Sequence, residues 1–211
     1  MFKISLFALL FILSKNTKED EKYPYSEWDE KTKMEANSAL DIEYYSETEK
    51  EVIYLMNLAR LNGKLFGQTY LQEYIDNPEF SIKKMTYLTS LQSDLKKLKS
   101  KGMKALKPQE DLYNSAKSHA ELQGKKGLTG HQNYDKRFKK FAPRYSTTGE
   151  NCDYGNDTAL EIVMHLLIDE DVSDKGHRKN ILNKTFLSVG LSIQNHKKYG
   201  TCCVMDFGDK D

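Results

Sequence analysis

Four stretches of the chain repeat apolar residues every three or four positions, the spacing of an amphipathic helix. The predicted helices cover residues 47–62, 80–100, 110–124 and 158–169. Two of them begin with capping boxes, at Ser46 and Thr158. In a capping box a hydroxyl, together with a glutamate three residues later, satisfies free backbone N–H groups.

The pattern changes near the C-terminus. Residues 186–193 alternate apolar with small or polar positions, and residues 199–207 form a second strand-like run. The intervening Asn-His-Lys-Lys predicts a turn, so the chain should end in a β-hairpin. Helices followed by a hairpin indicate an α+β layered domain. Residues 125–149 show no sustained period and are expected to form a long loop, a kind of segment that is often functional.

The N-terminus begins Met-Phe-Lys and continues with an apolar run from Ile4 to Leu13. This is typical of a secretory signal peptide or N-terminal anchor over residues 1–14, because the run is shorter than a bilayer span. We expect residues 15–45, which are polar and acidic, to be a spacer before a domain at 46–211. The protein is thus expected to be secreted, periplasmic or in the cell envelope.

Charge adds one expectation about partners. The net charge is only +1, which gives no argument for nucleic acid. Residues 83–140, however, hold fifteen Lys or Arg against five Asp or Glu. This excess fits either solvated helix faces or contact with an anionic surface such as lipid headgroups or cell-wall polymer.

The chain has three cysteines, at positions 152, 202 and 203. Adjacent cysteines rarely pair with each other, so Cys152 could pair with Cys202 or Cys203, leaving one thiol. Three buried thiols are the alternative. A nucleophilic role for Cys152 is not favoured, because nothing in the sequence would lower its pKa.

Histidines and carboxylates in loops and at helix ends stand out in the second half of the chain. They are His131, Glu150, Asp169 and His177. Two imidazoles with carboxylates suit a divalent metal such as zinc, and equally suit acid–base chemistry. Their spacing alone fits ordinary loop residues as well, and the sequence has no HExxH helix, GxSxG elbow or phosphate-binding loop.

Taken in order, the motifs resemble the CAP superfamily of cysteine-rich secretory, antigen 5 and pathogenesis-related proteins, in its bacterial form. The resemblance covers about residues 47–207. The motifs that carry it are Glu51–Arg60 (EVIYLMNLAR), Ala116–Ala120 (AKSHA), Gly130-His131, Gly149-Glu150-Asn151, Gly176–Leu182 (GHRKNIL), Val189–Leu191 and Val204–Phe207.

This resemblance implies a three-layer α-β-α sandwich with a central antiparallel sheet and a C-terminal β-hairpin. It also implies a cleft lined by His131, Glu150 and His177, with Asp169 where the family usually has Glu. Residues 80–106 look like a helical insertion. Around the cleft we expect His119 to be a core histidine bonded to a carbonyl or a partner of the cleft, and Asn151 and Arg178 to bond backbone groups.

For function, the resemblance implies a non-enzymatic secreted binding module for a lipid or an anionic cell-envelope ligand. The alternative is a zinc-dependent hydrolase in which His131 and His177 hold the metal and Glu150 is the general base. The ligand, the oligomeric state and the use of zinc are left open by the sequence.

Overall fold

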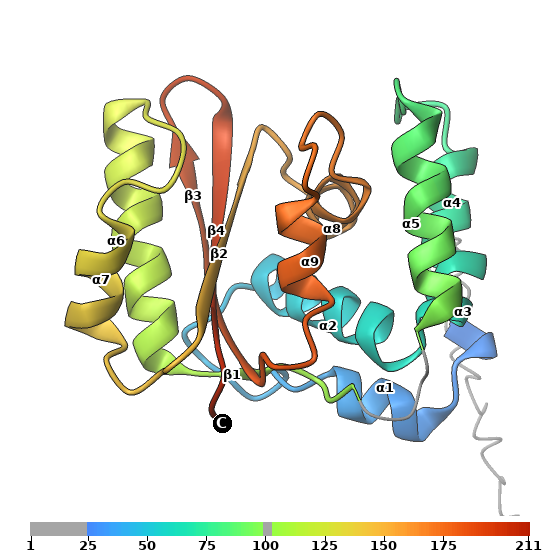
Figure 1. The fold of residues 1–211 in the computed structure, drawn as a ribbon, viewed down its shortest axis with the longest axis horizontal. Helices are drawn as coiled ribbons and strands as arrows, with labels where there is room; N and C mark the ends of the chain where they lie inside the picture. The colour runs from blue at the N-terminus through green and yellow to red at the C-terminus, as the bar shows by residue number, and fades with distance from the viewer. Residues whose placement is uncertain (1–24, 99–102) are drawn as a thin grey trace, which may run out of the picture.

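A four-stranded mixed sheet forms the middle layer of the protein in the computed structural model, which describes residues 25–98 and 103–211 (Figure 1). The strands are β1 (Lys107–Pro108), β2 (Thr148–Tyr154), β3 (Ser188–His196) and β4 (Gly200–Gly208), in the order β1-β3-β4-β2. The C-terminal hairpin β3–β4 is confirmed. The sheet is not wholly antiparallel as expected, because the two-residue β1 pairs parallel with β3.

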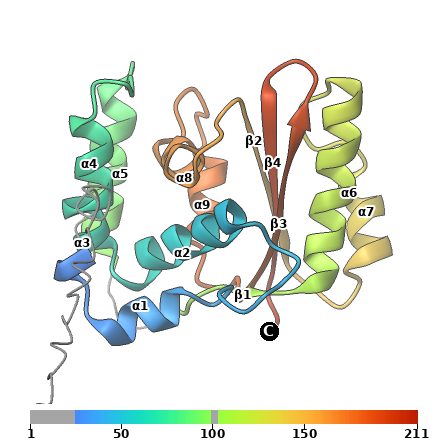
Figure 2. The ribbon, with the colours of Figure 1, turned by 180° about the vertical axis from the view of Figure 1, so that it is seen from behind.

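Helices cover both faces of this sheet, which confirms the predicted α-β-α layers (Figures 1 and 2). On one face lie α6 (Glu110–Lys126) and α7 (Tyr134–Phe141). On the other lie α2 (Glu47–Leu61), α8 (Ala159–Ile168) and α9 (Gly176–Ile181). Beyond them stand α3 (Gly63–Gln68), α4 (Tyr70–Asp76) and α5 (Met85–Lys97). No helix in the described ranges is long and apolar enough to cross a membrane.

Local signals explain the main helices. Both predicted capping boxes are formed: Ser46 with Glu49 starts α2, and Thr158 with Glu161 starts α8. Helix α6 lies so close to β3 that only glycine fits at position 190. A Cβ on Gly190 would lie 2.0 Å from the Tyr113 backbone nitrogen. Small residues of α6, Ala116 and Ala120, pack beneath it against Val204. The close approach of helix and sheet therefore depends on residues with little or no side chain.

The segment predicted as a spacer is packed against the domain from residue 25 onward. It forms a short 3-10 turn (Tyr25–Glu27) and α1 (Glu30–Ala36), and Trp28 is only 3% exposed. Ala36, Ala39 and Tyr45 are also in the main core. These apolar residues are too few and too widely spaced to give a periodic signal among acidic neighbours. Residues 1–24, including the expected signal peptide, lie outside the described residues.

The expected loop at 125–149 contains α7 and the start of β2. Helix α7 has a weak apolar signal, because Lys and Arg fill most positions between Tyr134 and Phe141. The helix predicted at 80–100 is shorter, and it joins the core through Leu88, Leu91 and Leu95. That residues 80–106 are an insertion stays a prediction.

Candidate functional site

The first histidine–carboxylate pair joins His131 to Glu150. Glu150 lies on β2 with its side chain 1% exposed, whereas the His131 side chain, in the loop after α6, is 49% exposed. His131 Nδ1 lies 2.7 Å from Glu150 Oε1. The buried carboxylate therefore orients an imidazole that is open to solvent on its other side.

Two further ionisable groups, Arg137 and Asp206, lie next to Glu150 inside the protein. The Arg137 guanidinium, from α7, lies 2.5 Å from Glu150 Oε2, and Asp206 is the cross-strand partner of Glu150 on β4. Burial alone would raise the Glu150 pKa, but the bond to His131 and the charge of Arg137 bring it below its ordinary value. Burial and the neighbouring Glu150 charge raise the Asp206 pKa well above its ordinary value. These shifts favour a protonated Asp206 beside an ionised Glu150, whose charge Arg137 balances.

Sequence reasoning missed Asp206 and Arg137. A signal existed for Asp206, because it interrupts the apolar run of the last strand, between Met205 and Phe207. Its side chain is fully buried. Arg137 gave no comparable signal, since it stands among the lysines of α7.

The second pair joins His177 to Asp169. Asp169 ends α8 with a φ of 61°, a conformation that Asp tolerates better than most residues. Its Oδ1 lies 2.7 Å from His177 Nδ1, and its Oδ2 accepts the backbone N–H groups of His177 and Arg178 at 3.0 and 3.2 Å. One carboxylate thus orients the imidazole and also caps α9.

Amide side chains tie the two pairs to each other. Asn151, next to Glu150 on β2, donates to the His177 carbonyl at 3.0 Å. Asn180 donates to the Asn151 side chain at 2.8 Å and to the Glu150 carbonyl at 3.3 Å. The backbone bond predicted for Asn151 is therefore present, and β2 and α9 are fixed side by side.

Arg178 anchors the far side of this arrangement, as the sequence predicts. Its guanidinium donates to the carbonyls of Leu167 and Ile168 at 2.6 and 2.8 Å, at the end of α8. It also bonds the Tyr87 carbonyl and Asp94 on α5. Arg178 therefore holds α8, α9 and α5 together.

His119 satisfies both descriptions expected from the sequence. It is fully buried on α6, and its Nε2 lies 2.8 Å from the Gly130 carbonyl. The same nitrogen is 3.9 Å from Glu150 Oε1. Burial lowers the His119 pKa, so the imidazole is neutral. It fixes the backbone immediately before His131.

The three cysteines are free and buried, so the disulfide expected as one alternative is not formed. Cys152 is opposite Val204 in the strand register and faces α6. Cys203 belongs to the core on the other face of the sheet. Burial raises the pKa of the Cys152 and Cys203 thiols well above their ordinary value, which disfavours a nucleophile.

The four residues of the expected tetrad do not assemble into one metal-binding group. His131 and His177 each face a separate carboxylate. Within the described ranges, the group of three or more His, Cys, Asp or Glu donors lying within 4.8 Å of one another is His119, Glu150 and Cys152. It contains neither His177 nor Asp169, so a zinc ion held by the whole tetrad does not fit this geometry.

A third histidine–carboxylate pair, His165 with Asp153, is not predicted from the sequence. His165 on α8 lies 2.5 Å from the buried carboxylate of Asp153 on β2. The hydrogen bond from Asp153 raises the His165 pKa. The imidazole is about half exposed and links helix to sheet, and nothing in the apolar pattern of α8 distinguished it.

Comparisons with known proteins show which family the chain resembles. Residues 53–207 match the model of the CAP family, described as the cysteine-rich secretory protein family. The protein YkwD of Bacillus subtilis (strain 168), described as uncharacterized, is 35% identical over 95 residues, which are 43% of this chain and 35% of that protein. The chain thus matches about a third of this relative's length.

Solved structures show lower identity. An outer surface protein of Borrelia burgdorferi is 18% identical with a TM-score of 0.45, covering 63% of this chain and 98% of that one. Venom allergen-like protein 4 of Schistosoma mansoni is 15% identical with a TM-score of 0.49, covering 79% and 91%. An extracellular SCP-domain protein of Bacillus anthracis is 18% identical with a TM-score of 0.44, covering 51% and 35%. Because the family model matches most of its length, the chain belongs to the CAP family of cysteine-rich secretory proteins.

Proposed function

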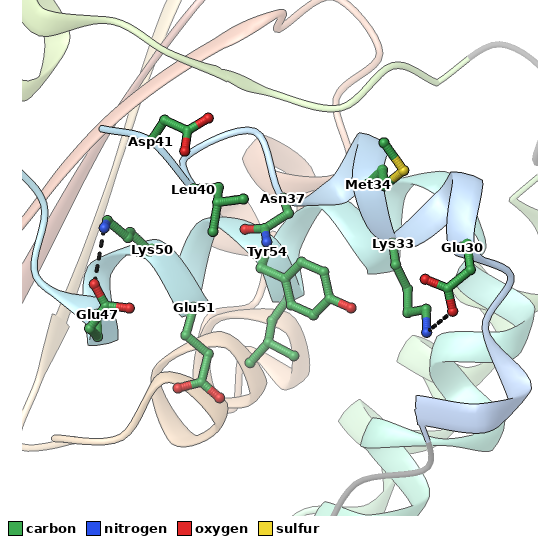
Figure 3. A pocket seen from close by; sticks show the side chains of 11 residues that line it. Glu30, Lys33, Met34, Asn37, Leu40, Asp41, Glu47, Lys50, Glu51 and Tyr54 are labelled. Carbon is green, nitrogen blue, oxygen red and sulfur yellow. Dashed lines mark hydrogen bonds and ion pairs between the residues drawn. The ribbon is translucent and has the colours of Figure 1, made fainter. Parts of the chain in front are cut away.

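We propose that this protein is an exported, non-enzymatic binding module whose ligand is an amphiphile held in a groove between α1 and α2. The groove has a volume of about 730 Å³ (Figure 3). It is the observation that carries the proposal, because lipid-sized ligands need a concave surface with an apolar lining.

Apolar side chains line part of this groove. Tyr54 and Leu55 belong to α2, while Met34 and Leu40 come from α1 and the turn after it. Met34 is 77% exposed and Leu40 is 57% exposed, more than is usual for large apolar residues. A ligand chain lying here would remove both from water.

The charges at the rim restrict the head group. Lys33 pairs with Glu30 and Lys50 pairs with Glu47. The other two charged lining residues, Glu51 and Asp41, form no ion pair with any residue that the structure describes. The groove therefore carries net negative charge, which favours an uncharged, zwitterionic or cationic head over a carboxylate.

Calorimetric titration with lysophosphatidylcholine below its micellar concentration tests this proposal, with oleate as the anionic comparison. We expect micromolar binding of the zwitterionic lipid and weaker binding of oleate. A double variant, Met34→Glu with Leu40→Glu, should lose binding, while Met85→Glu, at an exposed methionine outside the groove, should keep it. Absence of binding, or equal binding by the double variant, overturns the proposal.

The anionic cell-envelope ligand expected from the sequence would be repelled by this groove. The exposed lysines of α7, Lys136, Lys139 and Lys140, lie on the opposite layer of the protein and would be its binding surface. Co-sedimentation with anionic vesicles at low and raised salt tests that alternative, because such contacts weaken as salt screens them.

Hydrolysis is a second candidate, favoured by the pairing of a solvent-open His131 with a buried, charged Glu150. Glu150 is enclosed between His131 and Arg137, so His131 and not Glu150 would take the proton from water. Cleavage of peptide and ester substrates that is lost in His131→Ala and kept in Lys136→Ala would support this function. Cleavage unaffected by His131→Ala would exclude it.

A further inference from the structure

We propose that the buried side of the first pair is a structural zinc site with the ligands Cys152, His119, Glu150 and His131. The set keeps His131 and Glu150 of the expected tetrad and replaces His177 and Asp169 with the buried imidazole of His119 and the thiolate of Cys152. This inference is independent of the groove and of its ligand.

The donors of His119, Glu150 and Cys152 form one cluster, and His131 lies beside two of them. Glu150 Oε1 lies 3.9 Å from His119 Nε2 and 2.7 Å from His131 Nδ1. Cys152 Sγ lies 3.8 Å from His131 Nδ1, and the donors of His119, Glu150 and Cys152 are within 4.8 Å of one another. Ligand atoms around tetrahedral zinc are roughly 3.3–3.6 Å apart, given bond lengths of about 2.0–2.3 Å. Zinc would therefore move His131 away from Glu150 and draw Glu150 toward His119.

Zinc binding would rearrange the surrounding hydrogen bonds. Coordination through Nε2 of His119 would move its proton to Nδ1, a buried atom with no hydrogen-bond partner among the described residues, and would release the Gly130 carbonyl, which still accepts from the Gln123 side chain. The bond between His131 and Glu150 is replaced by shared coordination. The Cys152 thiol gives its proton to water, so each zinc bound releases one proton from the thiol.

The rest of Glu150 is already arranged as a ligating carboxylate usually is. Its Oε2 forms an ion pair with Arg137, and ligating carboxylates are commonly held by a polar partner on the oxygen away from the metal. Soft thiolate with imidazole favours zinc over magnesium or calcium, which prefer oxygen ligands.

Burial indicates that the site is structural. The His119 and Glu150 side chains are at most 1% exposed, and residue Cys152 is 7% exposed, so only His131 is open to solvent. Four protein ligands close the coordination sphere and leave no position for a reacting water. The ion would join α6, the loop before α7, and β2.

Cobalt titration of the reduced, metal-stripped full chain tests the proposal, because Co²⁺ bound by a thiolate has a charge-transfer absorption band in the near ultraviolet. We expect this band at one equivalent, loss of the band on adding Zn²⁺, and a higher melting temperature with zinc. Cys152→Ser should abolish the band, and His119→Gln should weaken cobalt binding at least tenfold.

Two variants serve as controls. Cys202→Ser changes another buried cysteine on the same face of the sheet, and His177→Ala removes the histidine of the expected tetrad; both should keep the band. Urea unfolding of each apo variant verifies that it is folded. Absence of cobalt binding at micromolar concentration overturns the proposal, as does a band that persists in folded Cys152→Ser or disappears in His177→Ala.

Discussion

The carboxylate of Asp169 receives both the imidazole Nδ1 and the backbone N–H of His177. Lys175, the residue at the N-cap of α9, provides no side-chain cap, so Asp169 caps this short helix from the end of α8. A side chain one methylene shorter than glutamate suffices here, because the left-handed backbone of Asp169 turns it directly toward α9. The second pair is therefore also the joint between two helices.

Two substitutions of Asp169 should distinguish the contribution of its charge to stability from the contribution of its hydrogen bonds and backbone conformation. Asp169→Ala removes three hydrogen bonds and places alanine in the left-handed region, so we expect a loss of about 2–4 kcal/mol in the free energy of unfolding. Asp169→Asn keeps an acceptor oxygen and tolerates the backbone, and should lose less than about 1.5 kcal/mol. Urea unfolding measures both. Equal losses would show that the charge alone matters.

The packing of residues 25–45 leads to a second prediction. Trp28 is buried, donates to the Thr69 hydroxyl at 3.3 Å, and lies against the Tyr70 ring. Trp28→Ala should therefore cost about 3–5 kcal/mol in unfolding free energy. The control is Met34→Ala on the exposed face of α1, expected within about 0.5 kcal/mol of wild type. A spacer outside the domain would give no difference between the two variants.

The elements predicted well from the sequence are those whose signals are local. The capping boxes of α2 and α8 and the alternation in β3 depend on residues a few positions apart, and each gives the observed element. By contrast, β2 has no apolar alternation in its sequence. Its buried residues include Glu150 and Asp153, whose charged partners are distant along the chain. No local pattern records such a partner.

The candidate site divides in the same way. Ordered family motifs contain His131, Glu150 and His177, the family resemblance adds Asp169, and the structure arranges the four as two pairs. Arg137 and Asp206 were missed because only the fold places α7 and β4 next to Glu150. The pairing itself, His131 with Glu150 and His177 with Asp169, depends on side-chain geometry that spacing does not encode.

The pair of His165 and Asp153 should make stability depend on pH. The hydrogen bond to Asp153 raises the His165 pKa in the folded protein above its ordinary value of 6.5. Its contribution to stability is therefore complete below that value and is lost as the pH rises through the folded-state pKa. The difference in unfolding free energy between wild type and His165→Gln should be largest near pH 6 and shrink toward roughly pH 9.

Asp153 provides the control for this titration. In Asp153→Asn the same His165→Gln change should have little pH dependence, because the carboxylate that raises the pKa is gone. Urea unfolding at several pH values measures all four proteins. A difference that grows with rising pH would contradict the assigned pairing.

The burial of all three cysteines predicts how the thiols react. Cys152, Cys202 and Cys203 are at most 7% exposed, and burial raises each thiol pKa, that of Cys202 to about 11. A thiol reagent should react slowly with the native protein and rapidly, at three equivalents, once urea unfolds it, since the thiolate is the reacting species. Cys202→Ser should release two equivalents. Recovery of a single reactive thiol from the unfolded wild type, restored to three by a reductant, would instead demonstrate a disulfide and require β2 and β4 to shift from the observed register.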